Sequence, residues 1–158
     1  MKTAPRRPRS AFRSHCEFAI VASQYNVELT QSLVDHAYQE IEALEHGAQI
    51  QLHWAPGTFE IPVLAKVLAM QAHYDAILTF GVVIEGQTSH AQMIGQSVTQ
   101  ALQHIAIETG IPVIDGIIMT DDFSMARSRC MDAEKNRGVE AARAAISVAR
   151  TMKSLRNA

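Results

Sequence analysis

One short stretch of the chain, GVVIEGQTSH from residue 81 to residue 90, combines residue types that suit anion binding and proton transfer. An apolar run ends at Gly86, polar side chains follow, and His90 comes where a long helical pattern begins. The first N–H groups of a helix lack partners within the helix, and the helix dipole adds partial positive charge there. The backbone after Gly86, with the side chains of Gln87 and Thr88, is therefore suited to hold a phosphate group.

A phosphate at this position also needs a cation, because the dipole contributes only about 0.3–1 kcal/mol at an exposed site. Arg129 is the candidate, since a guanidinium can bind two oxygen atoms at once. His90 falls in the first helical turn, where the dipole disfavours the imidazolium, so that the ring can accept and return a proton near neutral pH. In the simpler alternative, Thr88 or Ser89 only caps the helix and His90 is structural.

Aromatic and acidic side chains follow two other apolar runs. Tyr25 and Phe59 each come after a predicted strand and could sandwich a flat heterocycle, although most aromatic side chains simply belong to a core. Glu60 could bind polyol or amide donors, or could only favour the start of a helix.

Four predicted strands alternate with helices along the chain. The strands are expected at residues 17–22, 49–54, 76–84 and 111–119. Helices are expected after Asn26 as N-cap, after the turn at 55–57, over about 89–109, after Asp121 and Asp122, and from about Gly138. Their predicted core-facing residues include Val63, Val67 and Met70 in the second helix, and Met93, Ile94, Ser97, Ala101, Leu102 and Ile105 in the third.

This alternation predicts an α/β fold, in which helices cover both faces of a central four-stranded parallel sheet. In such sheets, ligands bind at the carboxyl ends of the strands. The polar and aromatic residues described above follow the predicted strands, so we expect them to gather at one edge of the sheet.

The composition is that of one globular domain. The chain has 158 residues, of which 47% are hydrophobic, and no apolar run is long enough to span a membrane. We predict a basic, flexible segment over residues 1–14 and a single domain over 15–158.

Charge and cysteine use narrow the classes of partner. Five of the fourteen basic residues lie within the first thirteen positions, which leaves nine against sixteen acidic residues in the rest. Such an acidic body is unsuited to binding nucleic acid, although the basic segment could be a nucleic-acid arm, a transit-like peptide or only a mobile leader.

Cys16 and Cys130 have no motif spacing, and we interpret them as reduced thiols of a cytoplasmic protein. The seven histidines form no metal-binding pattern, so no metal is expected.

Three segments of the chain, which occur in the same order as in the family, resemble motifs of the lumazine synthase family. PGTFEIP at 56–62 is similar to the family's PGAFEIP, residues 81–90 are similar to its G-x-V-I-R-G-x-T-x-H, and Gln24-Tyr25-Asn26 is similar to its RFN. The sequence Asn136-Arg137-Gly138 matches the asparagine, basic residue and glycine that precede the family's last helix. The likeness extends from Phe18 almost to the end of the chain.

The resemblance implies a flavodoxin-like three-layer αβα sandwich and a transferase of riboflavin biosynthesis. The reaction would condense 5-amino-6-(D-ribitylamino)uracil with 3,4-dihydroxy-2-butanone 4-phosphate to 6,7-dimethyl-8-ribityllumazine, with release of phosphate and without metal or organic cofactor. The family's site lies between subunits of a pentamer. The resemblance therefore also implies a homo-oligomer, with a possible functional link to riboflavin synthase.

Carried over position by position, the resemblance assigns roles to individual residues. His90 would be the acid–base group, and Gln87, Thr88 and Arg129 would hold the phosphate. The pocket for the pyrimidine and the ribityl chain would be lined by Tyr25, Asn26, Thr58, Phe59, Glu60, Val82, Val83, Ile84 and Asp115. Asp115 and Arg129 would be contributed by the neighbouring subunit.

The chain departs from the family pattern at four places. Tyr25 replaces the usual phenylalanine, Glu85 stands where arginine is common, and Asp115 replaces a frequent phenylalanine. Residues 129–135 lack the glycines of the common GTKAGNKG linker, which favours an open pentamer or decamer over a sixty-subunit shell. The alternative function is a non-catalytic oligomer of the same fold that binds flavin or lumazine. A redox flavodoxin is disfavoured because no Ser/Thr-Gly-rich loop follows the first strand.

Overall fold

The computed structural model describes residues 15–86 and 90–158. The predicted basic segment at 1–14 and the predicted phosphate-binding residues Gln87 and Thr88 lie outside the described residues. The strands are β1 (Glu17–Ser23), β2 (Gln49–Ala55), β3 (Ala76–Ile84) and β4 (Val113–Thr120). The helices are α1 (Val27–Leu44), the 3₁₀-helix η1 (Thr58–Glu60), α2 (Ile61–Met70), α3 (Ala91–Thr109), α4 (Phe123–Met131) and α5 (Arg137–Arg156).

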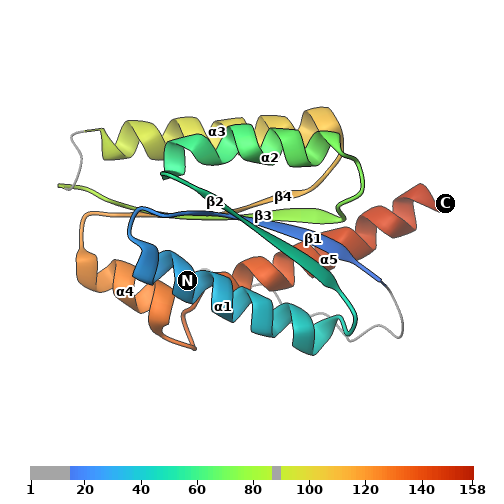
Figure 1. Ribbon diagram of the computed structural model, residues 1–158, viewed down its shortest axis with the longest axis horizontal. Coiled ribbons are helices and arrows are strands. Elements are labelled where there is room, and N and C mark those ends of the chain that lie inside the picture. The colour runs from blue at the N-terminus through green and yellow to red at the C-terminus, as the bar shows by residue number, and fades with distance from the viewer. Residues whose placement is uncertain (1–14, 87–89) are drawn as a thin grey trace.

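The four strands form one parallel sheet in the order β2-β1-β3-β4. Helices α2 and α3 cover one face, and α1, α4 and α5 cover the other (Figure 1). The predicted three-layer αβα sandwich with a four-stranded parallel sheet is thus confirmed. Because all strand pairs are parallel, the chain passes from one strand to the next through a helix. The carboxyl ends of all four strands therefore lie at the same end of the sheet.

The core lies on both faces of the sheet. Every residue of β3 is buried, as expected of a strand with helices on both sides. On one face Phe18, Leu33 and Ile146 belong to a cluster shared with α1 and α5, and on the other Ile77 and Leu102 belong to one shared with α2 and α3. Within the described residues, no helix is both long and apolar enough to cross a membrane.

The prediction for the inner face of α2 is wrong. Val63, Val67 and Met70 are 62%, 55% and 67% exposed in the single chain. The buried positions of α2 are instead Ile61, Ala65, Leu68 and Ala69. Because Lys66 is its only charged residue, α2 is apolar on nearly every side, and helical spacing alone fits two different stripes. The stripe that contacts the sheet is the one that contains the two small residues Ala65 and Ala69.

The prediction for α3 is partly wrong. Leu102 and Ile105 are buried and Ile94 is half-buried, but Met93 and Ser97 are exposed, and Ala101 is only half-buried. The inner stripe also contains Ala91, Gly95 and Val98. A side chain at Gly95 would collide with Met119 of β4, so this glycine lets α3 pack closely on the sheet. A glycine carries no hydrophobic signal, which explains why the spacing pointed to the wrong neighbours.

Candidate active site

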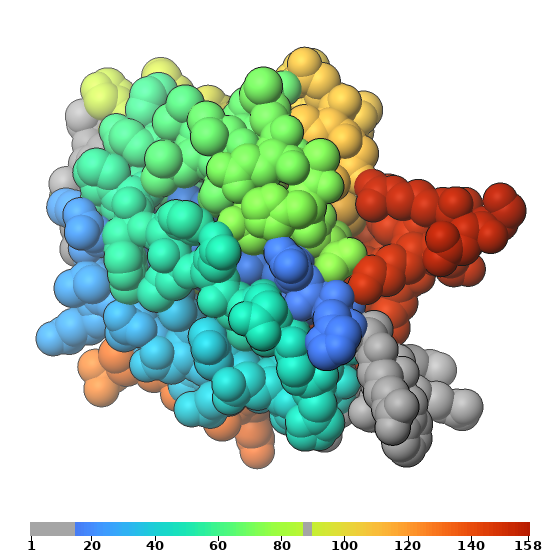
Figure 2. Space-filling model, turned by 45° about the vertical axis from the view of Figure 1, so that its right-hand side comes forward, coloured from blue at the N-terminus to red at the C-terminus, as the bar shows by residue number. Residues whose placement is uncertain are grey.

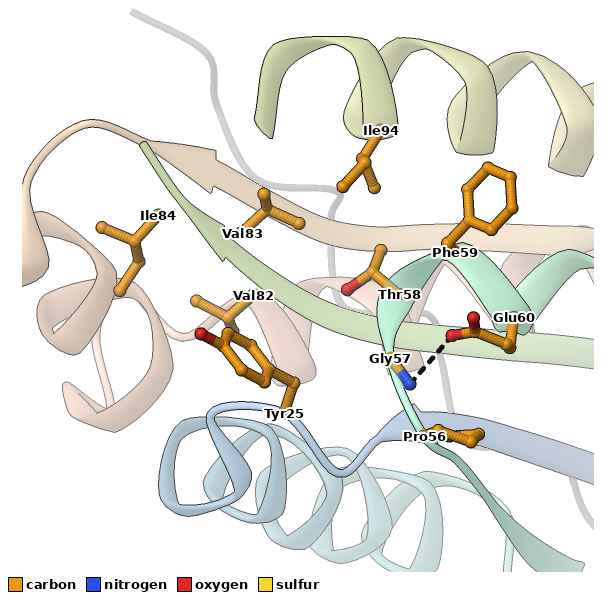
Figure 3. A pocket seen from close by; sticks show the side chains of 10 residues that line it. All are labelled: Tyr25, Pro56, Gly57, Thr58, Phe59, Glu60, Val82, Val83, Ile84 and Ile94. Carbon is orange, nitrogen blue, oxygen red and sulfur yellow. Dashed lines mark hydrogen bonds between the residues drawn. The ribbon is translucent and has the colours of Figure 1, made fainter. Parts of the chain in front are cut away.

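A cavity of about 310 Å³ opens where β1, β2 and β3 end. Its walls come from four segments: Tyr25 after β1, residues 56–60 after β2, the end of β3 from Val82 to Ile84, and Ile94 of α3 (Figure 3). The sheet edge at which we expected the polar and aromatic residues to gather therefore carries a cavity, as the topology of parallel sheets requires. Seven of the nine residues predicted for the pyrimidine pocket line it.

Two backbone hydrogen bonds and one side-chain hydrogen bond hold the three strand ends together. The Gln24 amide donates to the Ala55 carbonyl at 2.8 Å, and the Tyr25 amide donates to the Pro56 carbonyl at 3.2 Å. The Asn26 side-chain amide donates to the Val82 carbonyl at 2.9 Å, which joins the start of α1 to the end of β3. The walls of the cavity are therefore fixed relative to one another before any ligand binds.

Asn26 differs from its prediction in one respect. It occupies the N-cap position of α1, but its side chain makes no capping hydrogen bond. The backbone of Asn26 is left-handed, with φ 58°, a conformation that asparagine tolerates better than most residues. Asn26 is not among the cavity-lining residues, and its amide acts on the cavity by holding the Val82 backbone.

The segment after β2 turns sharply and places three side chains with different properties side by side. The Gly57 amide donates to Glu60 Oε2 at 3.0 Å, so the carboxylate closes the turn (Figure 3). Thr58 is buried against β3, and a Cβ atom at Gly81 would lie only 2.5 Å from Thr58 Oγ1. Gly81 thus makes room for the threonine that forms the floor of the cavity.

The two aromatic side chains stand on opposite sides of the cavity. In Figure 3 the Phe59 ring points towards α3 and Ile94, whereas the Tyr25 ring lies on the side of α1 beside Val82. Their exposed fractions are 54% for Tyr25 and 64% for Phe59. Large aromatic side chains exposed at the rim of an apolar cavity indicate a binding site for a flat ligand. Ile94 was predicted as a core residue, and only the structure reveals that it lines the cavity.

His90 marks the beginning of α3. It is the N-cap residue, it is exposed, and its carbonyl accepts the Ile94 amide at 2.9 Å. His90 and Ile94 are thus one helical turn apart, so the His90 backbone lies at the start of the helix that carries Ile94, although His90 is not among the residues that line the cavity. Gly86, at the other end of the loop, has φ 93°, a conformation that favours glycine.

Arg129 and Asp115 do not line the cavity of their own chain. Arg129 is exposed in the last turn of α4. Asp115 lies on β4, where its carboxylate accepts the Ile117 amide at 2.9 Å and the Thr99 hydroxyl at 3.3 Å. Arg137 donates to the Asp115 carbonyl oxygen at 3.1 Å. The single chain therefore brings together the predicted pyrimidine pocket, while these two residues face elsewhere.

A second, smaller cavity of about 180 Å³ adjoins the first on the side of β4. Val83 belongs to the walls of both cavities, and Glu85 and Asp121 line the second. Glu85 therefore brings negative charge close to the loop that we predict to hold phosphate. Among the described residues, no three His, Cys, Asp or Glu side chains are grouped so that they could hold a metal ion.

Comparisons with known proteins agree with this geometry. The model of the family described as 6,7-dimethyl-8-ribityllumazine synthase matches residues 15–153. The 6,7-dimethyl-8-ribityllumazine synthase of Coxiella burnetii (strain Dugway 5J108-111) is 38% identical over 143 residues, which cover 90% of this chain and 95% of the relative. Proteins of the same name from Coxiella burnetii strains CbuG_Q212 and RSA 493 / Nine Mile phase I are each 37% identical with the same coverage.

Proposed function

The chain belongs to the 6,7-dimethyl-8-ribityllumazine synthase family, and we propose that it condenses 5-amino-6-(D-ribitylamino)uracil with 3,4-dihydroxy-2-butanone 4-phosphate to 6,7-dimethyl-8-ribityllumazine, releasing phosphate. It is an enzyme of riboflavin biosynthesis, a transferase, as sequence analysis predicts. The choice of these two substrates is the part that is proposed.

The observation that carries the proposal is the cavity at the ends of β1, β2 and β3. Its two aromatic side chains, Tyr25 and Phe59, stand on opposite walls and suit a flat pyrimidine between them. Val82, Val83 and Ile84 supply an apolar wall, and Glu60 supplies a carboxylate for the hydroxyl or amino groups of the ligand. A pyrimidine that carries a polyhydroxylated chain needs these surfaces.

The phosphate of the second substrate is assigned to the start of α3. Gln87 and Thr88 precede the helix, and free N–H groups at a helix start bind anions. Arg129 of a neighbouring subunit would add the cation that a dianion requires. As phosphate leaves, these groups would stabilise the charge that builds up on its oxygen atoms.

His90 is proposed to move the protons of the reaction. Imine formation removes protons from the pyrimidine's amino group, and loss of phosphate requires a proton to be taken from the carbon skeleton of the butanone. The His90 backbone lies one helical turn before Ile94 of the cavity wall, and a histidine at this point would act as the general acid and base of both steps. Holding the two reactants together in one cavity would supply much of the remaining acceleration, of the order of 7–11 kcal/mol at best.

The reaction site is proposed to be completed by a second subunit. Family membership implies small-molecule substrates and an oligomer. A pentamer or decamer is the assembly that we propose, with Asp115 and Arg129 reaching the cavity of the neighbour. The exposed stripe of Val63, Val67 and Met70 on α2 supports assembly, because three neighbouring large apolar side chains are a surface that another chain can bury. The link to riboflavin synthase and the cytoplasmic location stay predictions.

The direct test supplies the purified protein with both substrates and follows lumazine absorbance together with phosphate release. We expect the two signals to grow in equal molar amounts. His90→Ala should lower turnover by roughly 10²–10⁴-fold, as loss of a general acid–base does, with phosphate affinity nearly intact. His104→Ala is the matched control, since His104 is an exposed histidine further along the same helix, at an ion-pair distance of 3.8 Å from Glu108.

A non-catalytic oligomer that only binds flavin or lumazine is the alternative from sequence analysis, and the same assay separates it. Such a protein would bind the lumazine tightly and form no product above the uncatalysed rate. Arg129→Ala adds a second criterion, because it should weaken binding of the butanone phosphate far more than that of the pyrimidine. Equal losses for both substrates would contradict the role assigned to Arg129.

A further inference from the structure

Three reactive side chains meet at the opposite edge of the sheet from the cavity, where β1 and β3 begin. Lys153 of α5 brings its Nζ atom to 3.4 Å from Cys16 Sγ and to 3.6 Å from Asp75 Oδ1. Asp75 is itself fixed, because its Oδ2 accepts the Glu17 amide at 2.8 Å. Figure 2 shows this side of the molecule, where the C-terminal half of α5 projects beside the start of the described chain.

The surroundings of this cluster favour contact between the sulfur and the amine. Cys16 is 1% exposed and the Asp75 side chain 18%, whereas the Lys153 side chain is 37% exposed. Burial by itself lowers the pKa of Lys153, but charge attraction and hydrogen bonds from Cys16 and Asp75 outweigh it, so that the pKa is raised. The amine is therefore held as an ammonium within 3.4 Å of the Cys16 sulfur, close enough to react with that sulfur once it is oxidised.

Cys130 provides a contrast within the same chain. It is also buried and outside any disulfide, and burial raises its pKa to about 12, although the charge of Arg129 acts in the opposite direction. A thiol with so high a pKa stays protonated and unreactive near neutral pH. A guanidinium, in addition, does not lose its proton in proteins and so cannot act as a nucleophile. Among the residues that the structure describes, Cys16 thus has an amine beside it that could trap an oxidised sulfur, whereas the cation near Cys130 could not.

We propose that Cys16 and Lys153 form an oxidative modification site, at which hydrogen peroxide joins the cysteine sulfur to the lysine nitrogen as a sulfenamide. The site lies at the edge of the sheet away from the proposed substrate cavity. Its product is a covalent bond between the start of β1 and the last helix, which are 137 positions apart in the sequence.

The chemistry balances in two steps. The thiolate sulfur first attacks one peroxide oxygen, and the O–O bond breaks. The sulfur becomes a sulfenic acid, oxidised by two electrons, and the other peroxide oxygen leaves as hydroxide, which takes a proton from solvent to become water. The Lys153 amine, after losing its extra proton to solvent, then attacks the sulfur. The S–N bond forms, the S–O bond breaks, and the hydroxyl leaves with an amine proton as a second water.

The first step prepares the second. A sulfenic acid is neutral under conditions in which the thiolate carries a charge, so oxidation removes the attraction that Cys16 exerts on the ammonium. Burial, which lowers the pKa of Lys153, is then opposed mainly by Asp75. Peroxide is not much larger than water, and the Lys153 side chain beside Cys16 is 37% exposed. Oxidation therefore makes the amine easier to deprotonate at the moment when it is needed.

The test treats the full-length protein with hydrogen peroxide and analyses it by intact mass and by peptide mapping without reductant. We expect a mass about 2 Da lower, the loss of two hydrogens that S–N bond formation requires, and one linked species that joins the peptides of Cys16 and Lys153. Dithiothreitol should restore the original mass. Lys153→Arg should abolish the link and increase trapping of the Cys16 sulfenic acid by dimedone, whereas Lys66→Arg should leave the link unchanged because Lys66 pairs with Glu108.

Three outcomes would overturn the proposal, and all are visible in the unmutated protein. The first is oxidation of Cys16 to sulfinic or sulfonic acid with no linked peptide. The second is a disulfide between Cys16 and Cys130, which has the same mass change but joins different peptides. The third is failure of Cys16 to react while exposed methionines such as Met93 are oxidised.

Discussion

Replacing Phe59 by alanine tests whether the cavity at the strand ends binds a flat ring. Phe59 is 64% exposed at the rim of the cavity. Burial of a whole phenylalanine side chain contributes about 1.5–3 kcal/mol, and only about a third of this one is buried, so Phe59→Ala should cost the fold about 0.5–1 kcal/mol. Stacking of a heterocycle on an aromatic side chain contributes about 1–3 kcal/mol. The ligand should therefore lose more free energy than the fold does.

The expected result is a rise of roughly 5- to 150-fold in the dissociation constant of the lumazine product. Calorimetric titration measures this constant, and thermal unfolding of the same sample measures the change in the fold. Tyr38→Ala is the matched control, because Tyr38 is an exposed aromatic residue of α1 that does not line the cavity. If Phe59→Ala and Tyr38→Ala bind the product equally well, the assignment of Phe59 as a stacking wall is wrong.

Three further predictions concern the shape of the cavity and the assembly. Gly81→Ala should cost about 1–3 kcal/mol of stability by overpacking against Thr58. Adding Thr58→Ala in the same chain should restore most of the lost stability, as measured by thermal unfolding. If the double variant is no more stable than Gly81→Ala, the clash lies elsewhere. Val67→Asp should leave the secondary structure intact but reduce the mass in solution to that of smaller species. Leu155→Asp should not, although Leu155 is even more exposed, at 66% against 55% for Val67. The variants His90→Ala and Arg129→Ala should each be nearly inactive alone. When subunits of the two variants are mixed at random, about a quarter of the sites should combine an intact His90 with an intact Arg129 and regain activity. A mixture without activity would place both residues of a site in one subunit.

Sequence analysis predicted the fold and most of the cavity because both depend on local patterns. Apolar runs separated by helical stretches define a parallel sheet, and the sheet itself brings Tyr25, Phe59 and Glu60 to one edge. None of these inferences requires knowledge of which distant side chains touch. The wall formed by Val82 to Ile84 was predicted only through the resemblance to the family, although the apolar pattern did predict the buried strand that these residues end.

The sequence-based predictions were wrong where a contact between residues far apart in the sequence decides which side chains are buried or bonded. The apolar residues of α2 fit two stripes, and only the packing against β1 and β3 selects the one with Ala65 and Ala69. The Asn26 amide reaches Val82, 56 positions away, instead of capping its own helix. The approach of Lys153 to Cys16 could not be foreseen either, because neither residue belongs to a spacing pattern and α5 must first pack against α1 and the sheet.

The hydrogen bonds of Asp115 have a consequence for solubility at high concentration. β4 ends the sheet on one side, and an unpaired strand edge invites pairing with a strand of another molecule. Here the Ile117 amide is occupied by the Asp115 carboxylate, and the Asp115 carbonyl is occupied by Arg137. A foreign strand arriving at this part of β4 finds these hydrogen-bonding groups already taken by the charged side chains of Asp115 and Arg137. The chain can therefore crowd against copies of itself with less risk that neighbouring sheets fuse into fibrils.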